Sequence, residues 1–218
     1  MSNSIVVAEK AVSVKPHPLG SLAKILLCSV FGPYGQDDGD GLKPMELYQS
    51  QVTRTQGAFS LRMFHQSWGL MMIQTNIKAP CMLLDFPTLD RFIQELRDHQ
   101  YDIIGISSII PNIEKVKKMS ELIRKYQPNA TIVIGGHITN IPKLHDMIDV
   151  DHIVKGEGIR WFRNFLGENE DQPLCHPMIV SGLNTRSCGI LLKDRPIDIA
   201  ATVIPSVGCP LGCNFCST

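Results

Sequence analysis

The chain has 218 residues, of which 44% are hydrophobic and 19% charged, and its formal net charge is zero. This composition is typical of a globular domain, and the neutral balance gives no electrostatic reason to expect nucleic acid or an anionic membrane as a partner. No apolar run reaches the roughly 18 residues needed to span a bilayer, and the first residues lack the pattern of a signal peptide. The sequence therefore favours a cytoplasmic protein.

Short apolar runs alternate with amphipathic segments along most of the chain. Residues 1–21 lack a clear period and are interrupted by proline and glycine, which predicts a flexible leader. Apolar runs without polar alternation predict strands buried on both faces, at residues 24–31, 79–85, 101–107, 131–135 and 151–155. Apolar residues at helical spacing predict helices within 59–77, over 89–96, over 113–127, from near Pro142, and over 159–166.

This alternation predicts the fold class α/β. We expect a doubly wound domain of Rossmann or flavodoxin type over residues 22–167, with a mainly parallel five-stranded sheet covered by helices on both faces. The stretch that follows is acidic and unpatterned, so residues 168–198 are interpreted as a linker. The apolar run 201–207 predicts a new strand, and a second unit is expected to begin over residues 199–218.

Seven cysteines are present, and this odd number in a chain without an export signal argues against a disulfide framework. Cys209, Cys213 and Cys216 form a C-x3-C-x2-C cluster. Cysteine thiolates are the usual ligands of iron–sulfur clusters, and three ligands leave one iron of a four-iron cluster open for a cofactor or substrate. The alternative is a zinc site whose fourth ligand is Cys188, Cys175 or His176, although zinc sites prefer C-x2-C pairs.

With Phe215 before the last cysteine, the cluster resembles the C-x3-C-x-Φ-C signature of radical S-adenosylmethionine enzymes. The resemblance implies that the three cysteines hold a [4Fe–4S] cluster and that S-adenosylmethionine chelates the fourth iron, with Phe215 against its adenine. It also implies an external electron donor. That family carries this loop after the first strand of a (β/α) barrel, so residues 199–218 are expected to form the first strand and cluster loop of an incomplete barrel.

The preceding α/β domain resembles the cobalamin-binding domain found ahead of the barrel in one radical S-adenosylmethionine subclass. Ligands of open α/β sheets bind beyond the carboxyl ends of the strands. The resemblance therefore implies cobalamin contacts from the residues that follow strands one, three, four and five: Phe31, Gly32, Ser107, Ser108, Gly135, Gly136, His137, Gly156, Glu157 and Gly158.

Three of the polar residues near these strand ends have alternative interpretations. The D-x-H-x-x-G motif that supplies a cobalt-ligating histidine in many cobalamin domains is absent after strand one, so the lower axial ligand is unassigned. His137 is interpreted as a turn residue rather than as that ligand, although it is placed to touch the cofactor. Glu157 has the alternative role of complementing the start of the next helix. Asp85 is interpreted as a turn residue.

The two resemblances together indicate a cobalamin-dependent radical S-adenosylmethionine enzyme of methyltransferase or related type. Two alternatives stay open: a non-catalytic cobalamin- or nucleotide-binding module, and a radical enzyme whose α/β domain no longer binds cobalamin. The sequence given ends two residues after Cys216. We therefore expect this piece to be inactive by itself and its last twenty or so residues to be poorly anchored.

Overall fold

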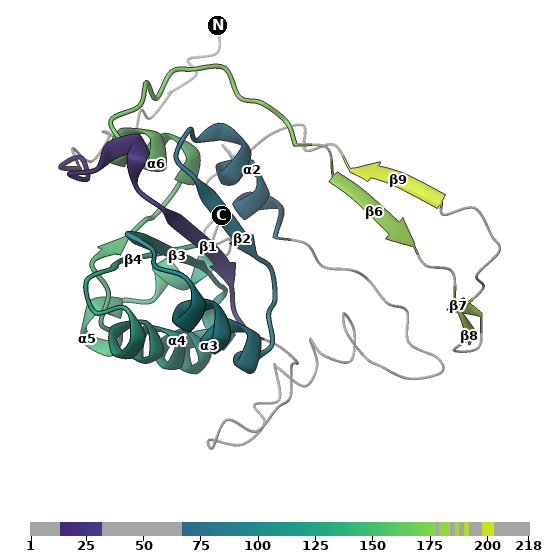
Figure 1. Ribbon diagram of the computed structural model, residues 1–218, viewed down its shortest axis with the longest axis horizontal. Helices are drawn as coiled ribbons and strands as arrows, with labels where there is room; N and C mark the ends of the chain where they lie inside the picture. Colours follow the sequence, from purple (N-terminus) through teal and green to yellow (C-terminus); the bar gives the residue numbers. More distant parts are fainter. Residues whose placement is uncertain are drawn as a thin grey trace, which may run out of the picture.

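A computed structural model describes residues 14–31 and 67–177, together with the backbone of short strands between 179 and 202. Its main body is a twisted sheet with helices packed on both sides (Figure 1). None of the described helices has the length and apolar character needed to cross a bilayer.

The sheet has five strands, all parallel, in the spatial order β2-β1-β3-β4-β5. The strands are β1 (Ile25–Ser29), β2 (Cys81–Leu84), β3 (Ile103–Ser107), β4 (Thr131–Gly135) and β5 (His152–Ile153). Each lies inside a predicted apolar run, which confirms the five-stranded parallel sheet. The chain passes from β1 to β2 on one side and then crosses to β3 on the other side of β1. The switch point of this flavodoxin-like order therefore lies between β1 and β3.

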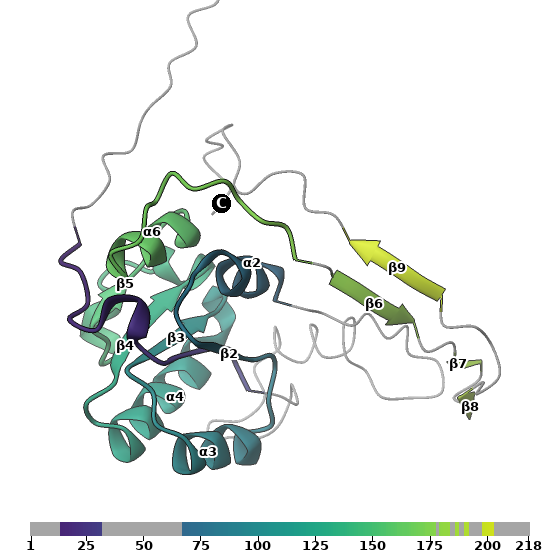
Figure 2. The ribbon, with the colours of Figure 1, turned by 45° about the horizontal axis from the view of Figure 1, so that its top comes forward.

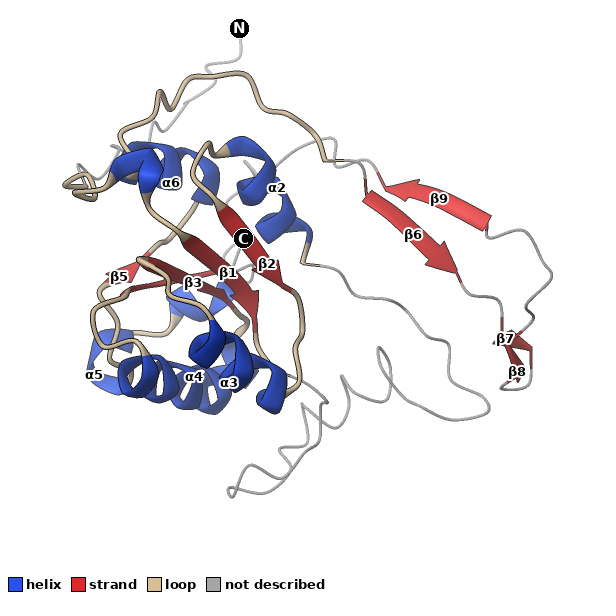
Figure 3. Cartoon of the chain, viewed as in Figure 1, coloured by secondary structure: helices blue, strands red, loops and turns tan. Residues whose placement is uncertain are grey.

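Helices cover both faces of this sheet (Figure 3). One face packs against α2 (Trp68–Asn76) and α6 (Gly158–Phe165), and the other against α3 (Leu89–Asp98), α4 (Ile113–Tyr126) and α5 (Leu144–Met147). Three short 3-10 helices also belong to this domain: η1 (Gly20–Leu22), η3 (Ile110–Asn112) and η4 (His137–Asn140). Every residue of β1 is buried because helices cover both of its faces, as its unbroken apolar run predicts.

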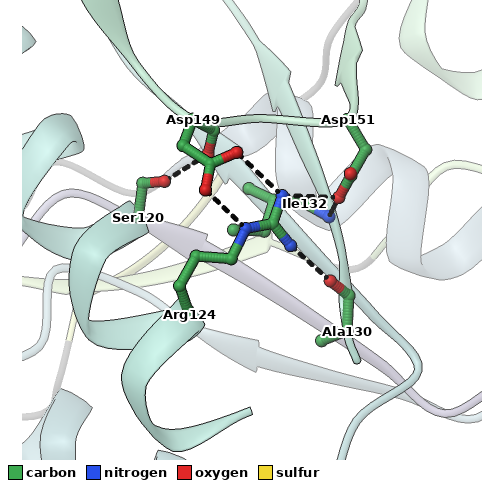
Figure 4. Close-up of polar contacts among 6 residues, drawn as sticks. All are labelled: Ser120, Arg124, Ala130, Ile132, Asp149 and Asp151. Atoms are coloured by element: carbon green, nitrogen blue, oxygen red, sulfur yellow. Dashed lines mark hydrogen bonds and ion pairs between the residues drawn. The ribbon is translucent and has the colours of Figure 1, made fainter. Parts of the chain in front are cut away.

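An ion-pair network fixes the β4–β5 end of the sheet to α4 (Figure 4). The Arg124 guanidinium donates to Asp149 Oδ2 and to Asp151 Oδ2, each at 3.0 Å. Asp151 Oδ2 also accepts the Ile132 amide at 2.7 Å, and the Ser120 hydroxyl donates to the Asp149 carbonyl. Burial lowers the pKa of Arg124, but its hydrogen bonds to the two aspartates outweigh this and raise the pKa above its usual value.

The region before β1 differs from the flexible leader expected over residues 1–21. The His17 amide donates to the Phe165 carbonyl at 2.7 Å, and the two rings meet edge to face at 5.5 Å. The Ser21 hydroxyl donates at 3.0 Å to Glu168, 147 positions along the chain. Residues 14–21 are therefore packed onto α6 and its continuation. Local sequence did not reveal this because the contacts are so distant in the chain.

The region after α6 also differs from the expected linker over residues 168–198. It contains β6 (Ile179–Leu183), β7 (Arg186–Ser187) and β8 (Ile190–Leu191), and β9 (Asp198–Thr202) begins at its last residue (Figure 2). β6 pairs antiparallel with β9, and β7 pairs antiparallel with β8. β9 thus begins before the strand predicted at residues 201–207. Residues 203–207 lie outside the described part of the chain.

Candidate functional site

The carboxyl ends of the central strands meet at one level of the sheet. Ser29 at the end of β1 is in register with Ser107 at the end of β3, which is in register with Gly135 at the end of β4. The switch point lies between β1 and β3, where ligands of open α/β sheets bind. Two of the predicted site residues, Ser107 and Gly135, therefore lie together at this carboxyl edge.

The segments that follow β3 and β4 are in direct contact. The Ser108 amide donates to the Gly135 carbonyl at 3.1 Å, and the Ile138 amide donates to the Ser108 carbonyl at 3.2 Å. Gly136 has φ +84° and ψ −171°, a combination reached almost only by glycine. A Cβ at Gly136 would lie 2.5 Å from the Ser108 carbonyl oxygen. Glycine is therefore required at this position by the approach of the two segments.

Gly135 differs from its neighbour because a Cβ there would meet no atom within 4 Å. The space beyond the end of β4 is open, and the exposed backbone of Gly136 borders it. His137 follows as the first residue of η4 and is half-buried. The Ser108 hydroxyl donates to the Ile109 carbonyl at 3.2 Å. An open edge of backbone, without side chains from two successive positions, can accept a bulky ligand at close range.

The segment after β5 reaches the same edge, and its acidic residue caps a helix. Glu157 Oε1 accepts the Ile159 amide and Oε2 accepts the Arg160 amide, each at 2.7 Å. This confirms the alternative interpretation of Glu157 as a group that complements the start of the next helix. Gly156 has φ +94°, and a Cβ on Gly158 would lie 3.0 Å from the Ile73 side chain.

We expect Glu157→Ala to lower the free energy of unfolding by about 1 kcal/mol, because two amides of the first turn of α6 lose their acceptor. Urea unfolding followed by circular dichroism measures this change. Lys155→Ala is the control, since Lys155 is exposed and precedes the cap. Equal stability of the two variants would contradict the capping role.

Phe31 differs from the other predicted contacts because its side chain belongs to the core. It is 1% exposed, and its carbonyl accepts a hydrogen bond from the buried Lys115 ammonium at 3.3 Å. The same ammonium lies 5.1 Å from the centre of the Phe31 ring. Lys115 belongs to the first turn of α4, so this contact joins the start of α4 to the end of β1. Gly32, Cys209, Cys213, Phe215 and Cys216 lie outside the described residues.

Asp85, interpreted from the sequence as a turn residue, joins three elements at the carboxyl edge. Its Oδ1 accepts hydrogen bonds from the Ser29 hydroxyl at 2.9 Å and the Ser67 hydroxyl at 2.6 Å, and its Oδ2 accepts the Ser67 amide at 3.0 Å. Ser29 Oγ in turn accepts the Phe86 amide at 2.5 Å. Phe86 has φ +44°, a strained value for a bulky residue. Asp85 therefore fixes the start of α2 beside the end of β1.

A second polar group that sequence reasoning missed is Asn112, which precedes α4. Its side chain is 3% exposed, and among the described residues no atom pairs with its Oδ1. Buried acceptors without partners are rare. Asn112 is the last residue of η3, which follows β3 at the switch point. The only sequence signal was its location between a strand and a helix.

A cavity lies at the opposite, amino edge of the sheet. It has a volume of about 280 Å³ and none of the predicted site residues lines it; its walls are Lys24, Gln100, Tyr101, Asp102, Gln127, Pro128, Asn129 and Ala130. The most buried polar side chain there, Gln127, uses its amide to bind the Tyr101 amide and the Leu96 and His99 carbonyls. We therefore assign this cavity no role in the candidate site.

Two cysteines lie within the sheet, and neither is suited to bind metal. Burial raises the pKa of the Cys28 thiol far above its usual value, and its Sγ donates to the Gly105 carbonyl. Burial also raises the pKa of Cys81 to about 12. Both thiols are protonated at neutral pH, whereas metals bind thiolates. Among the described residues, no group of three or more His, Cys, Asp or Glu side chains could hold a metal ion.

Comparison with protein families agrees with this geometry. The model of the B12 binding domain matches residues 58–166, which is half of the chain. The chain belongs to the B12-binding domain family. The match includes β2 to β5 and every predicted contact after strands three to five, so this part of the carboxyl edge lies within the matched B12 binding domain, while β1 precedes the match. No curated protein matches the chain. B12-binding domains occur in cobalamin-dependent enzymes.

Proposed function

We propose that the chain is the N-terminal portion of a cobalamin-dependent radical S-adenosylmethionine enzyme. The carboxyl edge of the B12-binding domain would hold cobalamin, and Cys209, Cys213 and Cys216 would hold a [4Fe–4S] cluster. The observation that carries the cobalamin part is the open backbone edge at Gly135 and Gly136 inside the matched domain. The cysteine spacing and Phe215 support the cluster part.

The described residues fit a large amide-bearing cofactor. Gly135 and Gly136 leave room where a side chain would otherwise stand, and Ser107 supplies a hydroxyl at the switch point. Asn112 holds a buried acceptor that lacks a partner among the described residues. Such an acceptor suits an N–H donor, and the corrin ring of cobalamin carries primary amides.

In this proposal the cofactors supply the chemistry and the chain positions them. Bound cobalamin supplies a cobalt centre able to carry a methyl group, and the cluster with S-adenosylmethionine supplies a radical. The chain's own contribution is steric and polar: the glycines admit the corrin, Ser107 hydrogen-bonds its nucleotide tail, and Phe215 packs on adenine. We infer methyl transfer or a related radical reaction, with an external electron donor.

We expect Gly135→Leu to weaken cobalamin binding by at least about tenfold, because the new side chain fills the open space beyond β4. The apolar contact that the cofactor loses by being displaced from a leucine-sized space is worth more than about 1.4 kcal/mol, which corresponds to a tenfold change in affinity. Stability should change little, since a Cβ there meets no atom within 4 Å. Titration of hydroxocobalamin, followed by its visible spectrum and by equilibrium dialysis, measures the affinity.

Gln100→Leu is the matched control, because it adds an apolar side chain at an exposed position on the opposite edge of the sheet. Its affinity should equal that of the wild type. A wild-type chain that neither retains cobalamin nor changes its spectrum would overturn the cobalamin proposal and favour a radical enzyme whose α/β domain no longer binds cobalamin. Equal affinities of Gly135→Leu and Gln100→Leu would instead exclude this edge as the binding site.

The cluster is tested separately by anaerobic reconstitution with iron and sulfide. We expect about four irons per chain and a reducible cluster seen by electron paramagnetic resonance. Replacement of Cys209, Cys213 and Cys216 by alanine should abolish both, whereas Cys175→Ala should change neither. One equivalent of zinc with no reducible cluster would favour the zinc alternative.

A further inference from the structure

The segment that follows α6 is held to the domain although little of it is buried. We refer to residues 168–175 as the strap. Leu174 is 53% exposed, and Cys175 is exposed as well. No helix or strand includes these residues. Apolar burial therefore cannot account for the position of the strap, and polar contacts must supply the attachment.

One buried cation provides most of that attachment. Arg163 of α6 is 2% exposed, and its guanidinium has five N–H donors. Nε donates to the Asn76 carbonyl at 2.8 Å, and Nη2 donates to Asn76 Oδ1 at 3.1 Å. Nη1 donates to the Gln172 carbonyl at 2.6 Å and the Glu170 carbonyl at 3.5 Å, while Nη2 reaches the Pro173 carbonyl at 3.3 Å.

These five contacts match the five donors of Arg163, and every acceptor is a neutral oxygen. A buried charge normally requires an opposite charge, because desolvation is costly. Here backbone and amide dipoles replace the counter-ion, and three of the five come from the strap. If the strap moved away, several buried N–H groups would lose their acceptors. Attachment of the strap and burial of Arg163 are therefore coupled.

Asn76, the last residue of α2, attaches the strap a second time. Its Oδ1 accepts the Cys175 amide at 2.7 Å, and its Nδ2 donates to the Cys175 carbonyl at 2.8 Å. The side-chain amide thus pairs with both polar backbone groups of one residue, as a neighbouring strand would. At the beginning of the strap, Glu168 Oε1 accepts the Lys78 amide at 2.9 Å as well as the Ser21 hydroxyl.

We propose that Arg163 and Asn76 are positioning residues that hold the strap in one place, so that the chain leaves the α/β domain from a fixed point. Helices α2 and α6 connect the carboxyl edge of the sheet to the strap. α2 begins beside Asp85 at the carboxyl edge, α6 begins at its cap Glu157 at the same edge, and both end at the strap. The point at which the chain leaves the domain is therefore fixed relative to the carboxyl edge. This inference does not depend on which ligand that edge binds.

The test is Arg163→Lys in the full chain, because lysine keeps the charge but has three donors in place of a planar set of five. Hydrogen–deuterium exchange measures the protection of residues 174–176. We expect the Cys175 amide to be protected in the wild type and its protection to fall by about tenfold in the variant, because its network loses hydrogen bonds to the strap. Arg160→Lys is the matched control on the exposed side of α6.

The proposal is overturned if the wild-type Cys175 amide exchanges as fast as an unstructured peptide, or if a folded Arg163→Lys variant keeps full protection. Cys175→Pro covers the case in which Arg163→Lys does not fold, since it removes the N–H that Asn76 Oδ1 accepts and changes the backbone only at an exposed position outside the core. Cleavage after Glu170 by a glutamate-specific protease should then rise by about tenfold with an unchanged melting temperature. An unchanged cleavage rate would also overturn the proposal.

Discussion

Gly136→Ala is expected to lower the free energy of unfolding by about 3 kcal/mol or more, because two separate costs combine at this residue. A residue with a Cβ pays of order 1–3 kcal/mol to adopt φ +84° and ψ −171°. The new Cβ would also lie 2.5 Å from the Ser108 carbonyl oxygen, which is backbone and cannot rotate away. Relief of that contact must separate the segments after β3 and β4, so cobalamin affinity should fall as well.

The neighbouring glycine supplies the matched control. Gly135→Ala adds the same methyl group one residue earlier, where no atom lies within 4 Å. We expect its free energy of unfolding to stay within about 0.5 kcal/mol of the wild type. Chemical denaturation of both variants, followed by circular dichroism, makes the comparison. If the two variants were equally stable, the close contact between Gly136 and Ser108 would not exist in solution.

Asp85→Ala is expected to cost about 3 kcal/mol, because the carboxylate accepts three hydrogen bonds at the end of the sheet. Its removal leaves the buried Ser29 hydroxyl without its acceptor and separates the start of α2 from β1. We also expect a loss of cobalamin affinity of about tenfold, since the switch point would no longer be ordered in advance of binding. Denaturation and cobalamin titration measure the two effects.

Two further variants separate this role from a general effect of charge. Asp98→Ala removes an exposed carboxylate at the end of α3 and should change stability by less than about 0.5 kcal/mol. Asp85→Asn keeps one acceptor oxygen and should recover part of the lost stability. If Asp85→Ala were as stable as Asp98→Ala, the network seen at the carboxyl edge would carry no energetic weight.

The strands of the sheet could be predicted because burial on both faces leaves a direct mark on the sequence. β4 was predicted with its observed ends, as an unbroken apolar run between two polar turns. β5 was predicted longer than its two residues, His152–Ile153, although the flanking Asp151 and Val154 amides still donate to the Ile132 and Ile134 carbonyls of β4. The order of the strands in the sheet was not predicted, because alternation of strands and helices indicates a parallel sheet without fixing which strands are neighbours.

The polar attachments could not be predicted, since each depends on residues far apart in the chain. Arg163 and Asn76 are 87 positions apart, and both belong to helices in which a polar residue usually marks the exposed face. Asp85 was interpreted as a turn residue because its partners Ser29 and Ser67 become neighbours only when β1 and β2 pair. Periodicity shows which face of an element is apolar but not which polar group is buried against it.

The candidate site was predicted in part. Ser107, Ser108, Gly135 and Gly136 were expected to lie together, and the structure brings them into contact. Phe31 was expected among the cofactor contacts, yet its side chain lies in the core because the apolar run of β1 continues two residues past the strand. Whether the other residues touch cobalamin stays a prediction.

The burial of Cys28 and the partial burial of Cys81 determine how these two thiols respond to thiol reagents. Alkylating agents and disulfides react with thiolates, and the raised pKa values keep Cys28 and Cys81 protonated at neutral pH. Of the three described cysteines, Cys175 is the exposed one. A spectroscopic label attached there would report on the pairing of its backbone with Asn76, while the interior of the sheet stays unmodified.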